Sequence, residues 1–277
     1  MSNQCSSCGE AKEKSCTEEE MNPLPKLYPG GQSRIGHVIA VMSGKGGVGK
    51  SSVTALMAVN LQRQGYKVGI LDADITGPSI PKMFGLKKIP ANPGLLLPAI
   101  SRTGIAIMSL NLLLEKEDEP VIWRGPMIAG AVKQFWTDVN WGELDYLLLD
   151  LPPGTGDVPL TVMQQIPVDG MVVVTSPQDL ALMVVKKAIN MAGIMEIPLL
   201  GVVQNMAYAV CPKCGERLEL FGKALQKGDV LDQLTVLEVL PIDPEFTRLC
   251  DHGQVENTAT RAFEDIPTLL KVKKQVS

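Results

Sequence analysis

Short apolar runs recur along the chain, and in several of them every successive position is apolar. Residues 146–149 read YLLL, and residues 171–174 read MVVV. A strand with one face in water alternates between apolar and polar residues, whereas a parallel strand covered by helices on both faces does not. These runs therefore predict a sheet that is buried on both sides.

Segments with helical periodicity separate these runs. Strands are expected at Val38–Met42, Val68–Leu71, Ile105–Leu110, Leu144–Leu149, Met171–Thr175, Leu199–Gln204 and Val236–Leu240. Helices are expected at Lys50–Gln64, Met127–Asn140, Val158–Ile166, Leu180–Met195, Pro244–Asp251 and Asn257–Leu270, the last interrupted or bent near Pro267. This alternation predicts a doubly wound α/β domain with a mostly parallel sheet and helices on both faces. Residues 85–120 carry too many prolines and glycines for the pattern and predict an irregular excursion or a short hairpin.

The first 33 residues differ from the rest. They are polar, contain three cysteines and end in the Pro/Gly-rich stretch NPLPKLYPGGQS, which predicts a flexible tail and linker (1–33) before one domain (34–277). Because no apolar stretch suits a secretory signal or a membrane span, we expect a cytoplasmic protein that does not bind membranes. The net charge of -4 gives no reason to expect nucleic acid as a partner.

One glycine-rich stretch stands between a predicted strand and a predicted helix. From Gly44 to Ser51 it reads GKGGVGKS, which fits the phosphate-loop pattern G-x-x-x-x-G-K-[ST]. Glycines let backbone N–H groups surround a phosphate, and the helix N-terminus adds positive charge. Lys50 is then expected at the β- and γ-phosphates, and Ser51 on Mg²⁺. The predicted nucleotide-binding residues of the loop are Gly44, Lys45, Gly46, Gly47, Val48, Gly49, Lys50, Ser51 and Ser52.

Acidic residues end two of the predicted strands. Asp72 and Asp74 follow the run VGIL, and Asp150 follows YLLL. Ligands of open α/β sheets lie at the carboxyl ends of the strands, so these carboxylates are expected beside the phosphate loop. Asp150 fits the Walker B pattern, whose carboxylate supports Mg²⁺. The alternative is that these residues merely cap the helices that follow.

The nucleotide base has a weaker signal. Asn205 ends the late strand VVQN and is a candidate hydrogen-bond partner of adenine, while PIDPEF after the next strand could surround the base. The N-K-x-D pattern of guanine binders is not evident, which favours ATP over GTP.

Five of the six cysteines fall in two groups. Cys211 and Cys214 form CPKCG, a knuckle that can offer two thiolates to one metal centre. A four-ligand site then needs another pair, either from the tail or from a second copy of the chain across a two-fold axis. Cys5, Cys8 and Cys16 are candidates for a second centre in the tail. Both an iron–sulfur cluster and a zinc site fit such knuckles.

The position of Lys45 carries a family resemblance. GKGGVGKS is similar to the deviant Walker A motif of the MinD, ParA and nitrogenase-iron-protein class of ATPases. This resemblance implies that Lys45 crosses a dimer interface to the nucleotide of the other subunit. It also implies that Asp72 supports the metal or its waters, and that Asp74 orients or deprotonates the attacking water, beside Lys50 and Asp150 as the other catalytic residues.

Several segments together narrow the resemblance. The phosphate loop, DADITGPSIPKMFG, LDLPPGTGD, TSPQDLAL and QNMAY with CPKCG resemble the Mrp (ApbC) iron–sulfur carrier ATPases over about residues 35–265. The resemblance implies a homodimer that hydrolyses ATP slowly, holds a [4Fe–4S] cluster between Cys211 and Cys214 of both subunits, and passes it to apo iron–sulfur proteins. Some members carry four amino-terminal cysteines for a second cluster, whereas this chain has three. Two alternatives are a MinD/ParA-type positioning switch with a structural zinc site and a reductase-like protein.

Overall fold

A sheet of nine strands forms the centre of the computed structural model, which describes residues 25–74, 79–87, 96–113, 125–177, 180–231 and 234–274. The strand order is β10-β11-β7-β6-β1-β5-β2-β4-β3; the two edge pairs, β10–β11 and β3–β4, are antiparallel and the other pairs are parallel. The strands are β1 (Arg34–Ser43), β2 (Val68–Asp72), β3 (Ala99–Ile100), β4 (Ala106–Ser109), β5 (Glu143–Asp150), β6 (Gly170–Thr175), β7 (Leu199–Gln204), β10 (Val230–Leu231) and β11 (Leu234–Val239).

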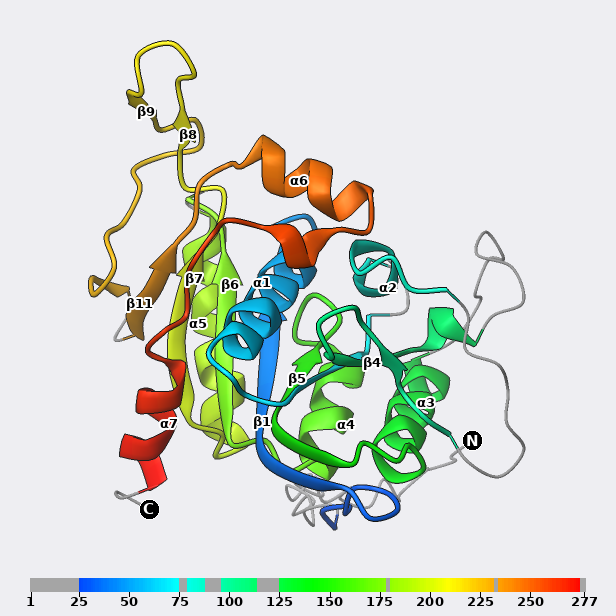
Figure 1. Cartoon of the computed structure of the whole chain (residues 1–277). Helices are drawn as coiled ribbons and strands as arrows, with labels where there is room; N and C mark the ends of the chain where they lie inside the picture. The colour runs from blue at the N-terminus through cyan, green and yellow to red at the C-terminus, as the bar shows by residue number, and fades with distance from the viewer. Residues whose placement is uncertain are drawn as a thin grey trace, which may run out of the picture.

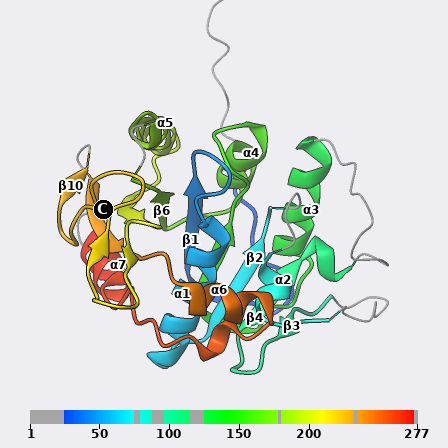
Figure 2. The same ribbon diagram turned by 90° about the horizontal axis from the view of Figure 1, so that it is seen from above.

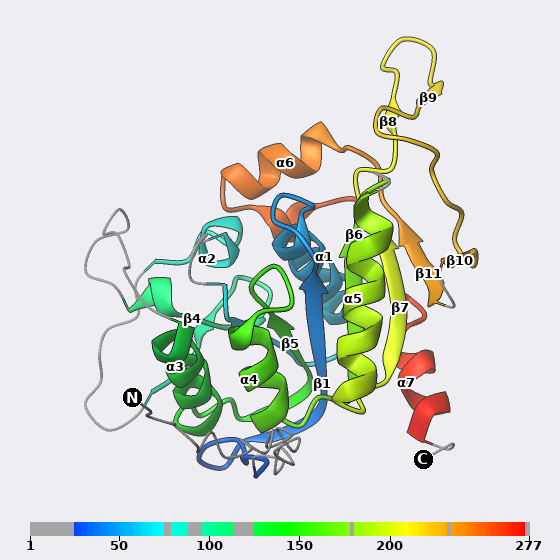
Figure 3. The same ribbon diagram turned by 180° about the vertical axis from the view of Figure 1, so that it is seen from behind.

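Helices cover both faces of this sheet (Figures 1 and 2). The helices are α1 (Lys50–Arg63), α2 (Ile80–Met83), α3 (Gly125–Thr137), α4 (Asp157–Gln165), α5 (Leu180–Ile194), α6 (Pro244–Asp251) and α7 (Ile266–Lys274). Helices α3, α4 and α5 lie together on the face shown in Figure 3, and α1, α6 and α7 lie on the other. Along β1, Ile39 and Val41 pack into the core under α1, while Val38, Ala40 and Met42 pack into the opposite core. The central strands are therefore apolar at successive positions because each face meets its own core.

The doubly wound α/β class predicted from the sequence is confirmed. Each of the seven predicted strands is present, with bounds that differ by a few residues, and helices occupy five of the six predicted segments. Within residues 85–120, β3 pairs with β4 in a short antiparallel hairpin, while residues 88–95 and 114–124 lie outside the described part of the chain. No helix among the described residues is both long and apolar enough to cross a bilayer.

The prediction of a helix over Asn257–Leu270, interrupted or bent near Pro267, is wrong. A 3₁₀ turn occupies Val255–Asn257, an irregular segment follows, and α7 begins only at Ile266. Side chains from other elements bind this segment's backbone: Asn60 Nδ2 donates to the carbonyl of Thr260, and the N–H of Phe263 donates to Glu238 Oε1. Pro267 does not bend the helix, because it lies in the first turn, where its missing N–H has no partner to lose.

Part of the segment predicted as a linker packs against the domain. The N–H of Leu27 donates to the carbonyl of Gln165 at 2.8 Å, and the indole N–H of Trp136 donates back to the carbonyl of Leu27 at 3.2 Å. A Cβ on Gly30 would stand 1.9 Å from the carbonyl oxygen of Thr137. The chain from Leu27 onward therefore belongs to the packed domain. The tail cysteines Cys5, Cys8 and Cys16 lie outside the described residues.

The parallel register brings polar side chains together at one edge of the sheet. Asp72 at the end of β2 stands beside Asp150 of β5 on one side and Ser109 of β4 on the other. The loop that follows β1 lies at the same edge, because Asp150 also pairs with Val41. Residues from four strands thus meet at the start of α1.

Candidate functional site

The loop between β1 and α1 depends on glycine at two positions. Gly47 and Gly49 have φ angles of 81° and 78°, in the left-handed region that side chains disfavour. Gly49 also has no room for a side chain, since a Cβ would stand 2.3 Å from Nδ2 of Asn205. That amide donates a hydrogen bond to the carbonyl of Val48 at 2.9 Å and so fixes the loop just before α1 begins. The loop therefore presents its backbone at a helix N-terminus, which is a site for phosphate.

Asp150 is the centre of the charged cluster at this loop. It is fully buried and lies 2.7 Å from Nζ of Lys50 through Oδ1. The hydroxyl of Ser51 donates to Oδ2 at 2.5 Å, and that of Thr54 donates to Oδ1 at 2.9 Å. Lys50 also lies 3.4 Å from Oδ2 of Asp74. The structure thus brings together Lys50, Ser51, Asp74 and Asp150, as the sequence predicted.

The surroundings of Asp72 disfavour the ionised form of its carboxyl group. Burial raises its pKa well above the usual 3.8, and the nearby charge of Asp150 raises the pKa further. The charge of Lys50 partly offsets these effects and lowers the pKa. Hydrogen bonds from the Ser109 hydroxyl to Oδ2 at 2.9 Å and from the Asp74 N–H to Oδ1 at 3.1 Å act in the same direction. Three carboxylates facing one ammonium group, together with the Ser51 hydroxyl, are a set of oxygen donors that suits Mg²⁺ held with a nucleotide.

Two supporting residues were missed by the sequence analysis. Thr54 lies one helical turn after Lys50 and binds the same carboxylate, and its i+4 spacing was a usable signal. Ser109 lies next to the end of the predicted strand Ile105–Leu110, at the carboxyl edge of the sheet, so its position was also a usable signal. Hydroxyl groups carry no pattern of their own, which explains why neither was singled out.

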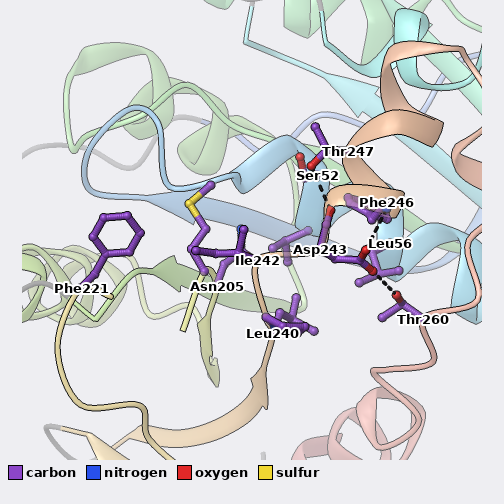
Figure 4. A pocket seen from close by; sticks show the side chains of 13 residues that line it. Ser52, Leu56, Asn205, Phe221, Leu240, Ile242, Asp243, Phe246, Thr247 and Thr260 are labelled. Carbon is purple, nitrogen blue, oxygen red and sulfur yellow. Dashed lines mark hydrogen bonds between the residues drawn. The ribbon is translucent and has the colours of Figure 1, made fainter. Parts of the chain in front are cut away.

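A pocket of about 320 Å³ opens beside the phosphate loop (Figure 4). Residues from α1, from the end of β7, from the segment after β9 and from the chain after β11 line it: Ser52, Val53, Leu56, Asn205, Met206, Phe221, Leu240, Pro241, Ile242, Asp243, Phe246, Thr247 and Thr260. The predicted base-binding stretch PIDPEF thus supplies one wall, and Asp243 shapes it by accepting hydrogen bonds from the N–H groups of Glu245 and Phe246 at the start of α6. Asn205 lines the same pocket, although its Nδ2 is bonded to the phosphate loop.

Lys45 lies early in the loop and is partly exposed. The hydroxyl of Ser43 donates to the Lys45 carbonyl at 3.1 Å, which fixes the backbone there. The contact expected for its ammonium group involves a second chain, so it stays a prediction.

The two cysteines of CPKCG lie at the tip of a hairpin away from the sheet (Figures 1 and 3). The hairpin pairs β8 (Ala209–Val210) with β9 (Arg217–Leu218), and the N–H of Gly215 donates to the carbonyl of Cys211 at 2.9 Å. Cys214 is exposed and Cys211 partly exposed, and neither forms a disulfide. Backbone N–H groups of Cys214 and Lys213 point at the sulfur of Cys211 and lower its pKa, which favours the thiolate that binds metals.

One copy of the hairpin supplies an incomplete set of metal ligands. Within the described ranges, no group of three or more Cys, His, Asp or Glu side chains is placed to hold a metal ion. Cys250 is buried on α6, where burial and the charges of Asp251 and Asp243 raise its pKa to about 11. It therefore suits packing rather than metal binding.

Comparisons with known proteins agree with this geometry. A family model described as "ParA: NUBPL iron-transfer P-loop NTPase" matches residues 34–276. The iron–sulfur cluster carrier protein of Clostridium perfringens is 42% identical over 266 residues, which cover 91% of this chain and 93% of that protein. The protein of the same name from Aquifex aeolicus is 47% identical over 261 residues, covering 91% of this chain and 70% of that one.

Solved structures show the same relationship. The nucleotide-binding protein of Archaeoglobus fulgidus, determined in complex with ADP, is 48% identical with a TM-score of 0.71 and covers 83% of this chain and 91% of its own. MinD of Pyrococcus horikoshii, complexed with Mg-ADP, has a TM-score of 0.53 over 88% of this chain and 96% of its own at 18% identity, a likeness of fold alone. The resemblance to iron–sulfur carrier ATPases is thereby confirmed. The chain belongs to the NUBPL iron-transfer family of ParA-like P-loop NTPases.

Proposed function

We propose that this protein is a cytoplasmic, ATP-hydrolysing carrier of iron–sulfur clusters that works as a homodimer. One [4Fe–4S] cluster is held between the Cys211–Cys214 pairs of two copies and is passed to apo iron–sulfur proteins. The observation that carries the proposal is the exposed thiol pair on a projecting hairpin, which offers half of a four-thiolate set. Relatives that match about nine tenths of the chain bear the name of iron–sulfur cluster carriers.

The residues at the phosphate loop have distinct tasks in nucleotide hydrolysis. Lys50 contacts the β- and γ-phosphates, and Asp150 orients Lys50 and the Ser51 hydroxyl. Ser51 would hold Mg²⁺ together with ATP, and the ion would supply positive charge to offset the charge that develops on the phosphates. Asp74 orients the attacking water, with Asp72 fixing its backbone. Lys45 reaches the nucleotide of the second copy, so hydrolysis in a single copy is slow.

The cluster is cargo, and the hairpin suits its release. Because the thiol pair is exposed, an acceptor protein can approach the cluster without unfolding the carrier. The free thiols also require a reducing compartment, which supports the cytoplasmic assignment. A second cluster at Cys5, Cys8 and Cys16 would need a fourth ligand from outside these three.

Anaerobic reconstitution with iron and sulfide tests the proposal. All variants carry Cys5→Ala, Cys8→Ala and Cys16→Ala, so that the tail contributes nothing. We expect visible absorbance, acid-labile sulfide and the mass of a dimer for the parent and for the control Cys250→Ala. Cys211→Ala and Cys214→Ala should stay colourless.

Full iron loading of Cys211→Ala would contradict the assignment of the cluster ligands. A colourless dimer that binds zinc would instead support the positioning switch with a structural zinc site, because zinc does not absorb visible light.

A further inference from the structure

The hairpin that carries the cysteines also supplies part of the pocket beside the phosphate loop. Phe221 lies in the segment that follows β9, shortly after Cys214, and it lines the pocket. In Figure 4 it stands at one side of the pocket and Phe246 at the other. Its side chain is 44% exposed, whereas Leu56 and Leu240 in the same lining are 3% and 7% exposed. A planar group in the pocket would cover the ring of Phe221.

The segment that follows β9 is anchored just after Phe221. Gly222 has a φ of 123°, and a Cβ there would stand 2.6 Å from the carbonyl oxygen of Pro177, so only glycine permits this approach. A few residues on, the N–H of Leu225 donates to Oε1 of Gln204 at 2.8 Å. Gln204 precedes Asn205, whose amide holds the phosphate loop. Phe221 is therefore held at the pocket by the backbone.

The outgoing strand of the hairpin starts at the same pocket. Met206 lines the pocket, and the N–H of Ala207 donates to the carbonyl of Leu240 at 2.9 Å. The carbonyl of Tyr208 accepts from the N–H of Ile242 at 2.7 Å, beside the pocket wall. The outgoing end of the hairpin thus rests on Leu240 and Ile242, which line the pocket. The returning end rests on Gln204, which directly precedes the lining residue Asn205.

We propose that Phe221 contacts the base of the bound nucleotide and couples occupancy of the pocket to the position of Cys211 and Cys214. This proposal rests on the proposed function in two respects: the bound nucleotide carries adenine, and the cargo of the cysteines is an iron–sulfur cluster. A base that packs against Phe221 holds the segment after β9 in place. It thereby restrains the tip of the hairpin, where the two cysteines lie. Sites linked in this way influence each other equally, so a change at the cysteines also changes nucleotide affinity.

Nucleotide affinity tests the contact in protein without a cluster. We compare Phe221→Ala, Phe221→Trp and the control Leu220→Ala. The Leu220 side chain lies in the same segment and is 58% exposed, but it does not line the pocket. The two probes are Mg-ADP and inorganic triphosphate, measured by calorimetry. We expect Phe221→Ala to weaken ADP binding about fivefold or more, as loss of a base–aromatic stack does, and to leave triphosphate binding unchanged.

Phe221→Trp should restore ADP affinity, and Leu220→Ala should match the parent for both probes. Unchanged ADP affinity in Phe221→Ala would overturn the contact. An equal loss for both probes would also overturn it, because a general disturbance of the loop lowers both affinities.

The rate of Cys211 alkylation by iodoacetamide tests the coupling and needs no cluster. At ADP concentrations that saturate each variant, we expect ADP to slow alkylation about fivefold in the parent and in Leu220→Ala, within the usual range of coupling between sites. In Phe221→Ala the rate should be the same with and without ADP. If ADP slowed alkylation in Phe221→Ala as much as in the parent, the coupling would be refuted. A failure of the carrier function is detected separately, because the reconstituted protein would then stay colourless.

Discussion

Lys50 and Asp150 are 100 residues apart in the chain, yet Nζ of the first lies 2.7 Å from Oδ1 of the second. The same carboxylate accepts hydrogen bonds from Ser51 and Thr54, so the end of β5 is tied to the first two turns of α1 at three points. One buried carboxylate thus orients the Lys50 ammonium and the Ser51 hydroxyl, to which the proposed function assigns the phosphates and Mg²⁺.

Asp150→Asn should separate hydrolysis from binding. The substitution keeps the volume and most of the hydrogen bonds but removes the charge that orients Lys50. We expect the rate of phosphate release to fall about 10- to 100-fold, with ADP affinity little changed, because the loop backbone still binds the phosphates. Asp138→Asn, at an exposed carboxylate after α3, is the matched control. Hydrolysis at the parental rate in Asp150→Asn would argue against this role.

Gly49 and Asn205 should show strongly non-additive effects. Gly49→Ala adds a Cβ that meets Nδ2 of Asn205 at 2.3 Å and is strained at a φ of 78°, so we expect a loss of about 3 kcal/mol in the free energy of unfolding. Asn205→Ala removes the opposing amide. In that background Gly49→Ala should cost only the backbone strain, about 1–2 kcal/mol.

Urea unfolding of the two single variants and the double variant measures this coupling. Additive losses in the double variant would show that the close approach of Asn205 is not what excludes a side chain at position 49.

Glu256 should make stability depend on pH. Burial raises the pKa of this carboxyl, but hydrogen bonds from Ser101 and Thr103, with help from Arg102, outweigh burial and hold the pKa below the usual 4.5. The folded state then binds the proton less readily than the unfolded state. Glu256 therefore adds stability above about pH 4.5 and loses it as the pH falls through its folded pKa.

Glu256→Gln should lower the free energy of unfolding by about 1.5–3 kcal/mol at pH 7. Urea unfolding at pH 7 and at pH 4 measures the difference, which should narrow at the lower pH. Glu245→Gln, at an exposed pair with Arg248, is the control and should change little at either pH. A gap between Glu256→Gln and the parent that widens toward pH 4 would contradict this assignment.

The cysteines of the domain should differ in reactivity. The lowered pKa and partial exposure of Cys211 favour its thiolate, whereas Cys250 is buried with a pKa of about 11. With limiting iodoacetamide near pH 8, peptide mapping by mass spectrometry should find Cys211 modified well before Cys250. The order should hold in Cys214→Ser, since backbone N–H groups supply most of the effect on Cys211. Earlier modification of Cys250 would show that α6 opens readily.

Local patterns were sufficient for the architecture and for most of the charged site. The apolar runs predicted the strands because each central strand is buried on both faces, and GKGGVGKS lies at a turn between strand and helix as its motif requires. Parallel register then placed Asp72 and Asp150 side by side, which follows from their positions at strand ends.

The sequence by itself determined the α/β order, the phosphate loop, the acidic strand ends and the paired cysteines, because each of these depends on neighbours within a few residues. Only the tertiary structure decided the rest. The segment between the 3₁₀ turn at Val255–Asn257 and α7 is not helical, because Asn60 and Glu238, distant in the chain, bind its backbone. Phe221 lines the pocket beside the phosphate loop because Gly222 packs against Pro177. Such contacts join residues far apart in the chain, and no local periodicity records them.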